Sequence, residues 1–223
     1  MSSPELEWRD DLIPVSTRFD DPYFSLDHGL HETNYVFLDG NGLPQGFKDG
    51  LSIAELGFGT GLNLLATVLA WRTSGVSGRF TYTSFEAYPM TAQDMQHAHA
   101  QFAELNDIAI EFAPLWDTLN TTGRIETKDV VVNLITGDAR DTLAAWEGQA
   151  DVWYLDGFSP AKNPELWGAD LMQQVFQHTA PQGRLATYTA AGFVRRNLLD
   201  AGFHVARRAG FGRKRHMTVA HKD

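Results

Sequence analysis

Apolar positions along this chain of 223 residues fall into two alternating types of segment. Short runs rich in β-branched and aromatic residues are typical of buried strands, whereas longer runs rich in Leu and Ala are typical of helices. Strands are predicted at residues 51–56, 79–87, 129–137, 151–158, 183–189, 203–210 and 215–222. Helices are predicted between them, at residues 62–72, 91–105, 139–146, 164–179 and 193–202.

This alternation predicts an α/β fold in which a doubly wound, largely parallel sheet lies between two layers of helices. No helix separates the last two predicted strands, so they are expected to pair as an antiparallel hairpin. The expected architecture is a Rossmann-like three-layer sandwich with a seven-stranded sheet and one antiparallel edge strand. Residues 1–50 have aromatic, strand-like pieces and are expected to form an N-terminal strap or hairpin. This strap would pack on residues 51–223 to give one structural domain.

Composition changes this picture by exclusion. The chain contains no Cys, which removes disulfides, thiolate-bound metals and cysteine nucleophiles. No apolar run approaches the roughly 18 residues that a membrane span needs, and the first residues lack the order of a secretory signal. A cytoplasmic protein with no membrane partner is therefore expected. His28 and His31 have no partners at metal-ligand spacing, so no metal site is predicted.

Charge is distributed unevenly along the chain. The net charge of -10 argues against a uniformly basic coat that binds nucleic acid. Basic residues nevertheless gather near the C-terminus, at Arg195, Arg196, Arg207, Arg208, Arg213, Lys214 and Arg215. Two interpretations stay open for this cluster: a solvated surface, or a local basic face that binds a polyanion.

A glycine-rich turn is the first candidate binding site. The stretch IAELGFGTGLNLL places Gly57, Gly59 and Gly61 between a predicted strand and a predicted helix. Glycines there permit a sharp turn and a close approach of a ligand, and the free N–H groups of the helix start attract electron-rich groups. Leu62 stands where a dinucleotide fingerprint needs Gly or Ala. A ligand other than a dinucleotide is expected here, although such turns also occur without a ligand.

The spacing E-x-G-x-G-x-G that begins at Glu55 resembles the first motif of class I S-adenosylmethionine-dependent methyltransferases. The resemblance implies S-adenosyl-L-methionine as cofactor. Glu86 ends a predicted strand, where it could accept both hydroxyls of a ribose, and the resemblance places Asp138 near the adenine. Each acid has the alternative role of capping the next helix. The predicted cofactor-binding residues are Glu55, Gly57, Phe58, Gly59, Thr60, Gly61, Asn63, Glu86, Asp138 and Tyr35.

Further stretches resemble one family more specifically. FDDPYFSLDHGLHETNYVF, LDGFSPAKNPELW, TAAGFVRRNLLDAGF and GFGRKRHM, together with the glycine turn, resemble the methyltransferase domain of the bifunctional MnmC-type tRNA wobble-uridine modification proteins. The resemblance runs from about Phe19 to Met217. It implies an S-adenosylmethionine-dependent tRNA methyltransferase that converts 5-aminomethyl-2-thiouridine to 5-methylaminomethyl-2-thiouridine at the wobble position.

The bifunctional family also carries an FAD-dependent domain that exposes the amine. This sequence ends soon after its last predicted strand, so a stand-alone methyltransferase is expected. The oxidative step would then come from a separate FAD-dependent oxidoreductase, or the aminomethyl form would be delivered directly. The expected partner is the anticodon stem-loop of tRNA.

Asp156 is the predicted catalytic residue, because it ends the fourth predicted strand beside the place where a methyl group should project. We expect it chiefly to orient the amine and secondarily to take its proton. The alternative to a catalytic role is that Asp156 belongs to an ordinary loop between a strand and a helix. The absence of Cys agrees with an amine as acceptor, because methylation at uridine C5 in this general fold commonly uses a cysteine. The predicted substrate-binding residues are Phe158, Pro160, Asn163, Arg195, Arg196, Arg213, Lys214 and Arg215.

Residues of the strap have open assignments. The aromatic residues Tyr23, Phe24 and Tyr35 would stack on an extruded base or on the adenine, or else pack in the core. The segment 32–34, Glu-Thr-Asn, is expected to reach the methionine part of the cofactor. Two other functions also stay open. One is a class I methyltransferase that acts on another amine, in a small molecule or a protein, and the other is a non-catalytic cofactor-binding scaffold for an oxidase partner.

Overall fold

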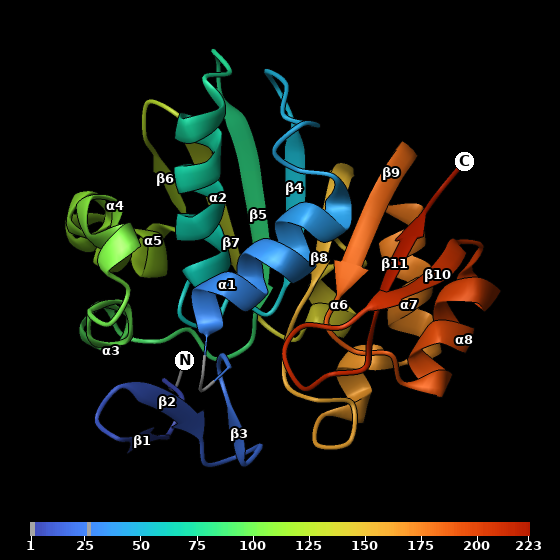
Figure 1. Ribbon diagram of the computed structural model, residues 1–223, viewed down its shortest axis with the longest axis horizontal. Helices are drawn as coiled ribbons and strands as arrows, with labels where there is room; N and C mark the ends of the chain where they lie inside the picture. The colour runs from blue at the N-terminus through green and yellow to red at the C-terminus, as the bar shows by residue number, and fades with distance from the viewer. Residues whose placement is uncertain (1–2, 26–27) are drawn as a thin grey trace.

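The computed structural model describes residues 3–25 and 28–223, and a mixed sheet of eight strands forms its centre (Figure 1). The strand order is β10-β11-β9-β8-β4-β5-β7-β6. Five neighbouring strands run parallel: β9 (Thr179–Thr187), β8 (Ala150–Leu155), β4 (Ser52–Leu56), β5 (Phe80–Glu86) and β7 (Val130–Thr136). The predicted α/β fold with a largely parallel sheet is confirmed.

The two ends of the sheet correct the prediction of seven strands with one antiparallel edge strand. The strands β10 (His204–Ala209) and β11 (His216–His221) form the expected antiparallel hairpin. However, β11 lies between β9 and β10, so this antiparallel strand is one position in from the edge. At the other edge, β6 (Arg124–Glu126) pairs antiparallel with β7. A strand of three residues is too short to produce an alternation that a sequence pattern can detect.

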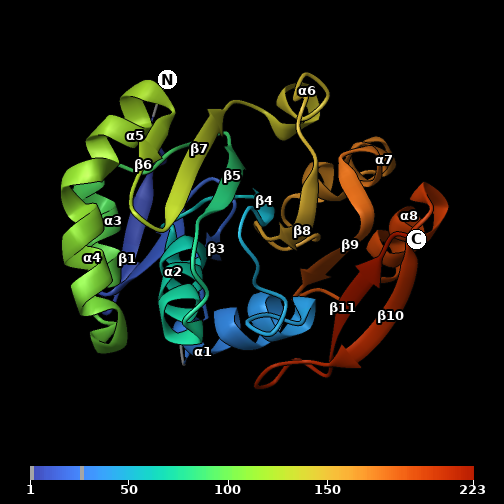
Figure 2. The same cartoon turned by 90° about the horizontal axis from the view of Figure 1, so that it is seen from above.

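Helices cover both faces of the sheet (Figure 2). The helices on and beside one face are α1 (Gly29–Thr33), α2 (Leu62–Ser74), α3 (Ala92–His99), α4 (Asn106–Phe112) and α5 (Trp116–Thr122). The helices on the other face are α6 (Ala139–Thr142), α7 (Ala169–Gln177) and α8 (Gly192–Ala201). The hydrophobic pattern does not predict α4 or α5, and it predicts a longer α6.

Two predicted helices are interrupted. The helix expected at 91–105 ends with α3, and a short 3-10 turn, η3 (Ala103–Leu105), follows it. The helix expected at 164–179 is divided into the 3-10 turn η5 (Pro164–Trp167) and α7, because the backbone of Gly168 is extended. Another 3-10 turn, η4 (Ala113–Leu115), connects α4 to α5.

Large aromatic side chains fill the space between the sheet and each helical layer. On one face the ring of Trp71 in α2 lies 5.0 Å from that of Phe80 in β5. On the other face Trp153 in β8 stacks at 6.2 Å on Phe85 in β5. Burying a large apolar side chain contributes about 2–3 kcal/mol. This packing holds α2 against β5 on one face of the sheet and joins β5 to β8 on the other.

The described part of the N-terminal segment forms a small antiparallel sheet followed by helical turns. Its strands are β1 (Leu6–Arg9), β2 (Ile13–Ser16) and β3 (Asp21–Pro22). After α1 the chain continues as a π-helical turn, η1 (Asn34–Leu38), and a 3-10 turn, η2 (Asp39–Asn41), where strand-like pieces are predicted. The apolar run looks like a strand because three consecutive residues, Val36, Phe37 and Leu38, are buried in the hydrophobic core although their backbone is helical.

Two predictions concern the strap and the membrane. Residues 26–27 of the predicted strap lie outside the described residues. Among the helices that the structure does describe, none combines the length and the apolar character required to cross a membrane.

The strand order reverses at β4, whose neighbours are β5 on one side and β8 on the other. The chain runs outward from β4 through β5 to β7 and then crosses to β8. In sheets of this type, ligands bind beyond the carboxyl ends of the strands at such a reversal. The carboxyl ends of β4 and β8 carry the glycine turn and Asp156, so the topology brings the two candidate sites together.

Candidate active site

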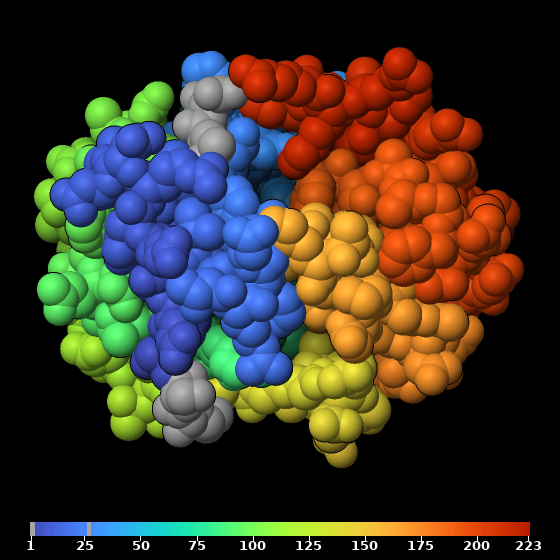
Figure 3. Space-filling view, turned by 90° about the horizontal axis from the view of Figure 1, so that it is seen from below, coloured from blue at the N-terminus to red at the C-terminus, as the bar shows by residue number. Residues whose placement is uncertain are grey.

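A cavity of about 740 Å³ lies at the carboxyl ends of the parallel strands. This volume is within the range of small-molecule sites, roughly 300–1,000 Å³. Figure 3 shows the surface hollowed where the N-terminal segment (blue), the loop after β8 (orange) and the C-terminal part (red) meet. The predicted site residues that line the cavity are Gly57, Phe58, Gly59, Thr60, Asn63, Glu86, Asp138, Asp156, Phe158, Asn163 and Lys214.

The glycine turn provides one wall of this cavity. Gly57 and Gly59 both have positive φ angles, +85° and +53°, which L side chains adopt only under strain. A Cβ atom at Gly57 would lie 3.1 Å from the Cα of Gly157 in the turn after β8. A Cβ atom at Gly59 would lie 3.1 Å from the ring of Tyr23. The absence of side chains therefore keeps the backbone accessible and allows the two turns to touch.

Glu86 lies beside the glycine turn at the end of β5. Its Oε2 accepts a hydrogen bond from the N–H of Gly59 at 3.0 Å, and its Oε1 accepts one from the N–H of Tyr88 at 2.8 Å. Burial raises the pKa of Glu86 above its ordinary value, against these backbone hydrogen bonds. Each carboxylate oxygen can accept a second hydrogen bond. Glu86 can thus bind a diol while it holds the glycine turn in place.

Asp138 has the capping role that the sequence leaves open, and its place near the adenine stays a prediction. Its Oδ1 accepts a hydrogen bond from the backbone N–H of Arg140 at 2.9 Å and so caps α6. Its carboxylate is also paired with the guanidinium of Arg140, which lowers the pKa of Asp138. Both residues line the cavity. Any ligand at this end of the cavity therefore meets a carboxylate already neutralised by its partner.

A chain of hydrogen bonds fixes Asp156. The Nδ2 of Asn63 donates to Asp156 Oδ2 and to Glu55 Oε1, both at 2.8 Å. The Oδ1 of Asn63 accepts a hydrogen bond from the hydroxyl of Thr33 at 2.9 Å. The backbone N–H of Gly157 donates to Asp156 Oδ1 at 2.8 Å. The first turn of α2, the end of β8 and the N-terminal segment thus jointly orient one carboxylate.

The electrostatic surroundings leave Asp156 suited to accept a proton. Burial raises the pKa of Asp156 to about 6, although the hydrogen bonds from Gly157 and Asn63 oppose this effect. At pH 7 about nine in ten such groups are ionised. Glu32 raises the pKa further and Lys214 lowers it, so both charges act on Asp156 across the cavity.

Glu55 does not line the cavity, which corrects its prediction as a residue that contacts the cofactor. Its side chain is 0% exposed, and its oxygens accept hydrogen bonds from Asn63 and, at 2.7 Å, from the hydroxyl of Ser84. Burial raises the pKa of Glu55 to about 8. Glu55 therefore acts on the site through Asn63.

The raised pKa of Glu55 gives a prediction for stability. A carboxyl group with a folded pKa of about 8 and an unfolded pKa near 4.5 favours the folded state fully below pH 4.5. This stabilisation is lost as the pH rises toward 8. The Glu55→Gln side chain can keep both hydrogen bonds and cannot ionise. We expect the free energy of unfolding of the wild type to fall by about 3–5 kcal/mol relative to this variant between pH 5 and 9.

Urea unfolding at a series of pH values measures this difference. Glu126→Gln, which changes an exposed glutamate on β6, serves as the matched control. Its pairing with Arg124 lowers the pKa of Glu126 from the ordinary value, so this variant should show the wild-type dependence on pH between pH 5 and 9. Parallel pH–stability curves for the wild type and Glu55→Gln would show that Glu55 is not protonated in the folded protein.

Several predicted residues lie away from the cavity lining. The hydroxyl of Tyr35 donates to the carbonyl of Ala209 at 3.1 Å, and its ring packs near Phe211, so Tyr35 is not placed to contact a ligand in the cavity. Gly61 precedes α2 and packs against buried side chains. The other predicted residues outside the lining are Pro160, Arg195, Arg196, Arg213 and Arg215.

The cavity also contains residues that the prediction of site residues omits. Tyr188 directly follows β9, so the strand-end argument that leads to Glu86 would have found it. Arg18 and Tyr88 pair at 4.8 Å across the cavity wall, which no local pattern reveals. The structure places Glu32 and Thr33, expected near the cofactor, in the lining, and Tyr23 and Phe24 with them. It does not place Asn34 there.

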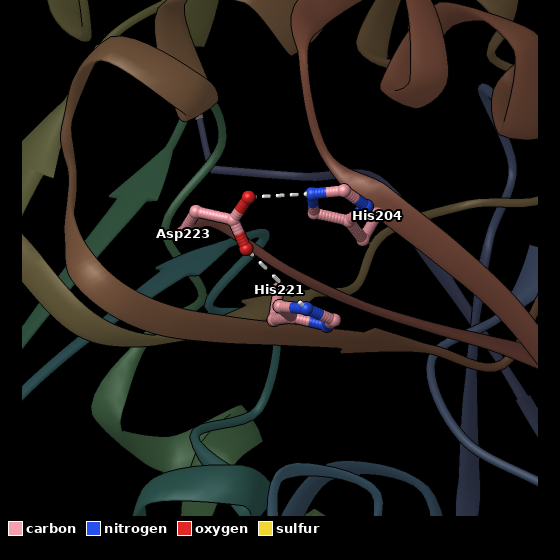
Figure 4. Close-up of side chains that lie close together, drawn as sticks. All are labelled: His204, His221 and Asp223. Carbon is pink, nitrogen blue, oxygen red and sulfur yellow. Dashed lines mark hydrogen bonds and ion pairs between the residues drawn. The ribbon is translucent and has the colours of Figure 1, made fainter.

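A separate cluster of possible metal ligands lies on the β10–β11 hairpin (Figure 4). The exposed side chains of His204, His221 and Asp223 bring one ligand atom each within 4.8 Å of the others. Asp223 Oδ2 lies 2.8 Å from His204 Nε2, and Asp223 Oδ1 lies 3.9 Å from His221 Nε2. Sequence spacing misses this cluster because it depends on the cross-strand pairing of the two histidines. None of the three lines the cavity, and the expectation of no metal stays a prediction.

Known proteins resemble this chain over nearly its whole length. It is 42% identical over 216 residues to the tRNA 5-methylaminomethyl-2-thiouridine biosynthesis bifunctional protein MnmC of Caulobacter vibrioides, covering 94% of this chain and 36% of that protein. It is 43% identical to the protein of the same name from Caulobacter sp. strain K31, covering 96% of this chain and 38% of that one. The chain therefore spans well under half the length of these curated relatives.

Solved structures agree on the fold. The crystal structure of MNMC2 from Aquifex aeolicus superposes with a TM-score of 0.76 at 27% identity, over 99% of this chain and 70% of that one. TrmN from Thermus thermophilus superposes with a TM-score of 0.52 at 15% identity, over 91% of this chain and 54% of that one.

A family profile described as S-adenosyl-L-methionine-dependent methyltransferase matches residues 101–223, which is more than half of the chain. This match agrees with the relatives above and with the glycine turn at the reversal of strand order. The chain belongs to the family of S-adenosyl-L-methionine-dependent methyltransferases.

Proposed function

We propose that this protein transfers a methyl group to the primary amine of 5-aminomethyl-2-thiouridine at the wobble position of tRNA, which produces 5-methylaminomethyl-2-thiouridine. One observation carries the proposal: Asn63 holds the carboxylate of Asp156 in the same cavity as the glycine turn and Glu86. A proton acceptor fixed beside a cofactor site suits an amine acceptor. The names of the two Caulobacter relatives support this nucleoside as the product.

The residues of the cavity fit S-adenosyl-L-methionine, the methyl donor of the family. The glycine turn leaves an open cradle that a Cβ atom at Gly59 would partly fill, and Glu86 has acceptor capacity for the ribose hydroxyls. We assign Gly57, Gly59 and Asn63 to the methionine side of the cofactor. When bound, this cofactor would supply an electrophilic methyl group on a positive sulfonium, and that charge would repel a nearby ammonium.

Asp156 acts on the amine that accepts the methyl group. An alkylamine has a pKa of roughly 10, so at pH 7 its neutral form costs about 4 kcal/mol. The carboxylate of Asp156 orients the nitrogen lone pair and receives the proton that the ammonium loses. Its hydrogen bonds to Asn63 and Gly157 keep the carboxylate in one position while it does so.

The tRNA would contact the loop between β10 and β11. Arg213 and Arg215 are exposed there, and Arg196 is exposed on α8. Lys214, between the two loop arginines, instead reaches into the cavity and pairs with Glu32 at 2.6 Å. We therefore assign the anticodon stem-loop phosphates to the arginines and a different task to Lys214.

The source of the aminomethyl group follows from the chemistry of the substrate. An FAD-dependent oxidoreductase activity that removes a carboxymethyl group would supply it, or the aminomethyl form would be made directly. A tRNA substrate would place the reaction in the cytoplasm.

The test uses the purified protein, labelled S-adenosyl-L-methionine and tRNA that carries 5-aminomethyl-2-thiouridine at the wobble position. Nucleoside mass spectrometry should show conversion to the methylaminomethyl form, and no methylation of the same tRNA with an unmodified uridine there. Methylation of small amines at equal efficiency, with aminomethyl tRNA unchanged, would contradict the proposal. The absence of any turnover would favour a cofactor-binding scaffold.

Reversing one charge on the loop tests the tRNA surface. We expect Arg213→Glu to weaken tRNA binding by about threefold to tenfold at physiological salt and to reduce the slope of log affinity against log salt by about 1. Binding of S-adenosylhomocysteine should not change. Lys128→Glu, a charge reversal on the exposed turn between β6 and β7, is the control and should retain wild-type tRNA binding. Equal losses for the two variants would show that the loop makes no specific phosphate contact.

A further inference from the structure

Lys214 places a primary ammonium inside the candidate active site. Its Nζ lies 2.6 Å from Glu32 Oε1 and 4.2 Å from the centre of the Tyr188 ring. All three residues line the cavity together with Asp156. A carboxylate on one side and an aromatic face on the other are the groups that recognise an alkylammonium.

The groups that hold this ammonium are fixed without Lys214. The hydroxyl of Tyr188 donates to the carbonyl of Gly157 at 2.8 Å. Gly157 follows Asp156 in the chain, so this hydrogen bond holds the ring of Tyr188 close to Asp156. Glu32 is 9% exposed and precedes Thr33, whose hydroxyl bonds to Asn63. The same elements that orient Asp156 therefore also orient Glu32 and Tyr188.

Lys214 itself is held less firmly. Its side chain is 43% exposed, and it stands in a loop between two exposed arginines, two residues after Gly212. Lysine has a flexible stem of four carbons, and a ligand ammonium that takes its place leaves the buried carboxylate of Glu32 paired. A ligand that offers the same charged group can replace it at little cost.

We propose that Glu32 and Tyr188 form the subsite that recognises the protonated aminomethyl group of the substrate, and that Lys214 occupies this subsite until the substrate enters. This inference rests on the proposed function, because it identifies the substrate as a primary alkylammonium. The ammonium of a lysine and that of an aminomethyl uridine have the same charge and the same three donors.

The arrangement separates two tasks between two carboxylates. Glu32 binds the ammonium, while the oxygens of Asp156 are held by Gly157 and Asn63 and Asp156 takes the proton. When substrate displaces Lys214, its charge becomes available for a phosphate beside Arg213 and Arg215. A uridine with a hydroxymethyl or methyl group at C5 lacks the charge and cannot displace Lys214.

Chemical labelling tests the exchange directly and needs no methyl transfer. The wild-type protein is treated with an amine-acetylating reagent, and mass spectrometry compares acetylation of Lys214 with that of Lys48, an exposed lysine paired with Asp151. We expect 5-aminomethyluridine to raise the ratio of Lys214 to Lys48 labelling several-fold. We expect 5-hydroxymethyluridine to leave it unchanged. Equal ratios with and without the amine would overturn the subsite.

A variant of the carboxylate provides the second arm. In Glu32→Gln the ratio of Lys214 to Lys48 acetylation should already be high without any nucleoside and should not change when 5-aminomethyluridine is added. Its thermal unfolding should match that of the wild type, which shows that the fold is intact. A ratio in this variant that stays low and still responds to the amine would also overturn the subsite.

Kinetics with the free nucleoside completes the test. 5-Aminomethyl-2-thiouridine offers no anticodon phosphates to attract Lys214. If Lys214 fills the subsite in about nine-tenths of the protein molecules, Lys214→Met should lower the KM for this nucleoside by about tenfold. Lys128→Met is the control and should leave KM unchanged. An unchanged KM in Lys214→Met would contradict the occupancy. A protein that exchanges Lys214 but methylates neither the free nucleoside nor aminomethyl tRNA would retain the subsite and refute the proposed function.

Discussion

We expect Asp156→Asn to lower kcat for methylation of aminomethyl tRNA by about 100-fold, the lower end of the range for a positioned proton acceptor. The amide cannot accept the proton of the substrate ammonium. It also replaces an acceptor by a donor near Asn63 Nδ2, which already donates to Asp156 and Glu55. The orientation of the amine should therefore suffer together with its deprotonation.

The pH dependence identifies the group responsible. Burial raises the pKa of Asp156 to about 6, and the ionised form is the one that accepts a proton. The wild-type kcat/KM should therefore fall as the pH decreases through about 6, whereas this limb should be missing in Asp156→Asn. Quenched assays with labelled cofactor between pH 5 and 9 measure both profiles.

Asp151→Asn is the matched control, because it makes the same change at the opposite end of β8. Asp151 pairs with Lys48 and accepts a hydrogen bond from the N–H of Ser52, so its loss should affect stability and leave the pH profile of kcat/KM unchanged. An Asp156→Asn enzyme with full rates between pH 6 and 9 would show that Asp156 neither orients nor deprotonates the amine.

The second large effect is expected for cofactor binding. Glu86→Ala should weaken the binding of S-adenosylhomocysteine by about 100-fold, or roughly 2.7 kcal/mol. The variant loses two charge-assisted hydrogen bonds to the ribose hydroxyls. It also leaves the N–H groups of Gly59 and Tyr88 without their acceptor, so the glycine turn loses its anchor.

Isothermal titration calorimetry measures this loss, and two variants calibrate it. Glu86→Gln keeps an acceptor for one backbone N–H and should bind with intermediate affinity. Glu126→Ala removes an exposed glutamate on β6 and should bind as the wild type does. If Glu86→Ala binds the ligand within about threefold of the wild type, Glu86 does not contact the ribose.

The five parallel strands and the β10–β11 hairpin were predictable, and with them the positions of Glu86 and Asp156, whereas β6, α4 and α5 were not. Both residues end buried apolar runs, and the parallel topology brings the ends of such runs to one edge. Local sequence patterns could therefore predict those residues of the cavity lining that directly follow a parallel strand. Tyr188 satisfies the same criterion after β9.

The remaining features depend on contacts between distant segments. Glu55 has the motif position of a ligand contact, but Asn63 and Ser84 surround its carboxylate, and only the packed structure shows this. Lys214 belongs to a run of basic residues whose pattern predicts one basic surface. Its ammonium instead pairs with the buried carboxylate of Glu32, 182 positions away, and so lies in the cavity. The insertion of β11 beside β9 likewise depends on pairing, which periodicity does not encode.

The contact between Gly57 and Gly157 limits how this enzyme can be redesigned. The turns after β4 and β8 lie against each other, so a side chain introduced at residue 57 would push on the backbone of Gly157, and one introduced at residue 157 would meet the side chain of Leu166. Attempts to accommodate bulkier alkyl donors by altering the turn at residue 57 would also displace the neighbouring proton acceptor. Engineering for such donors should begin at Tyr23, whose ring lies against Gly59 and is carried by the N-terminal segment and not by the backbone of either turn.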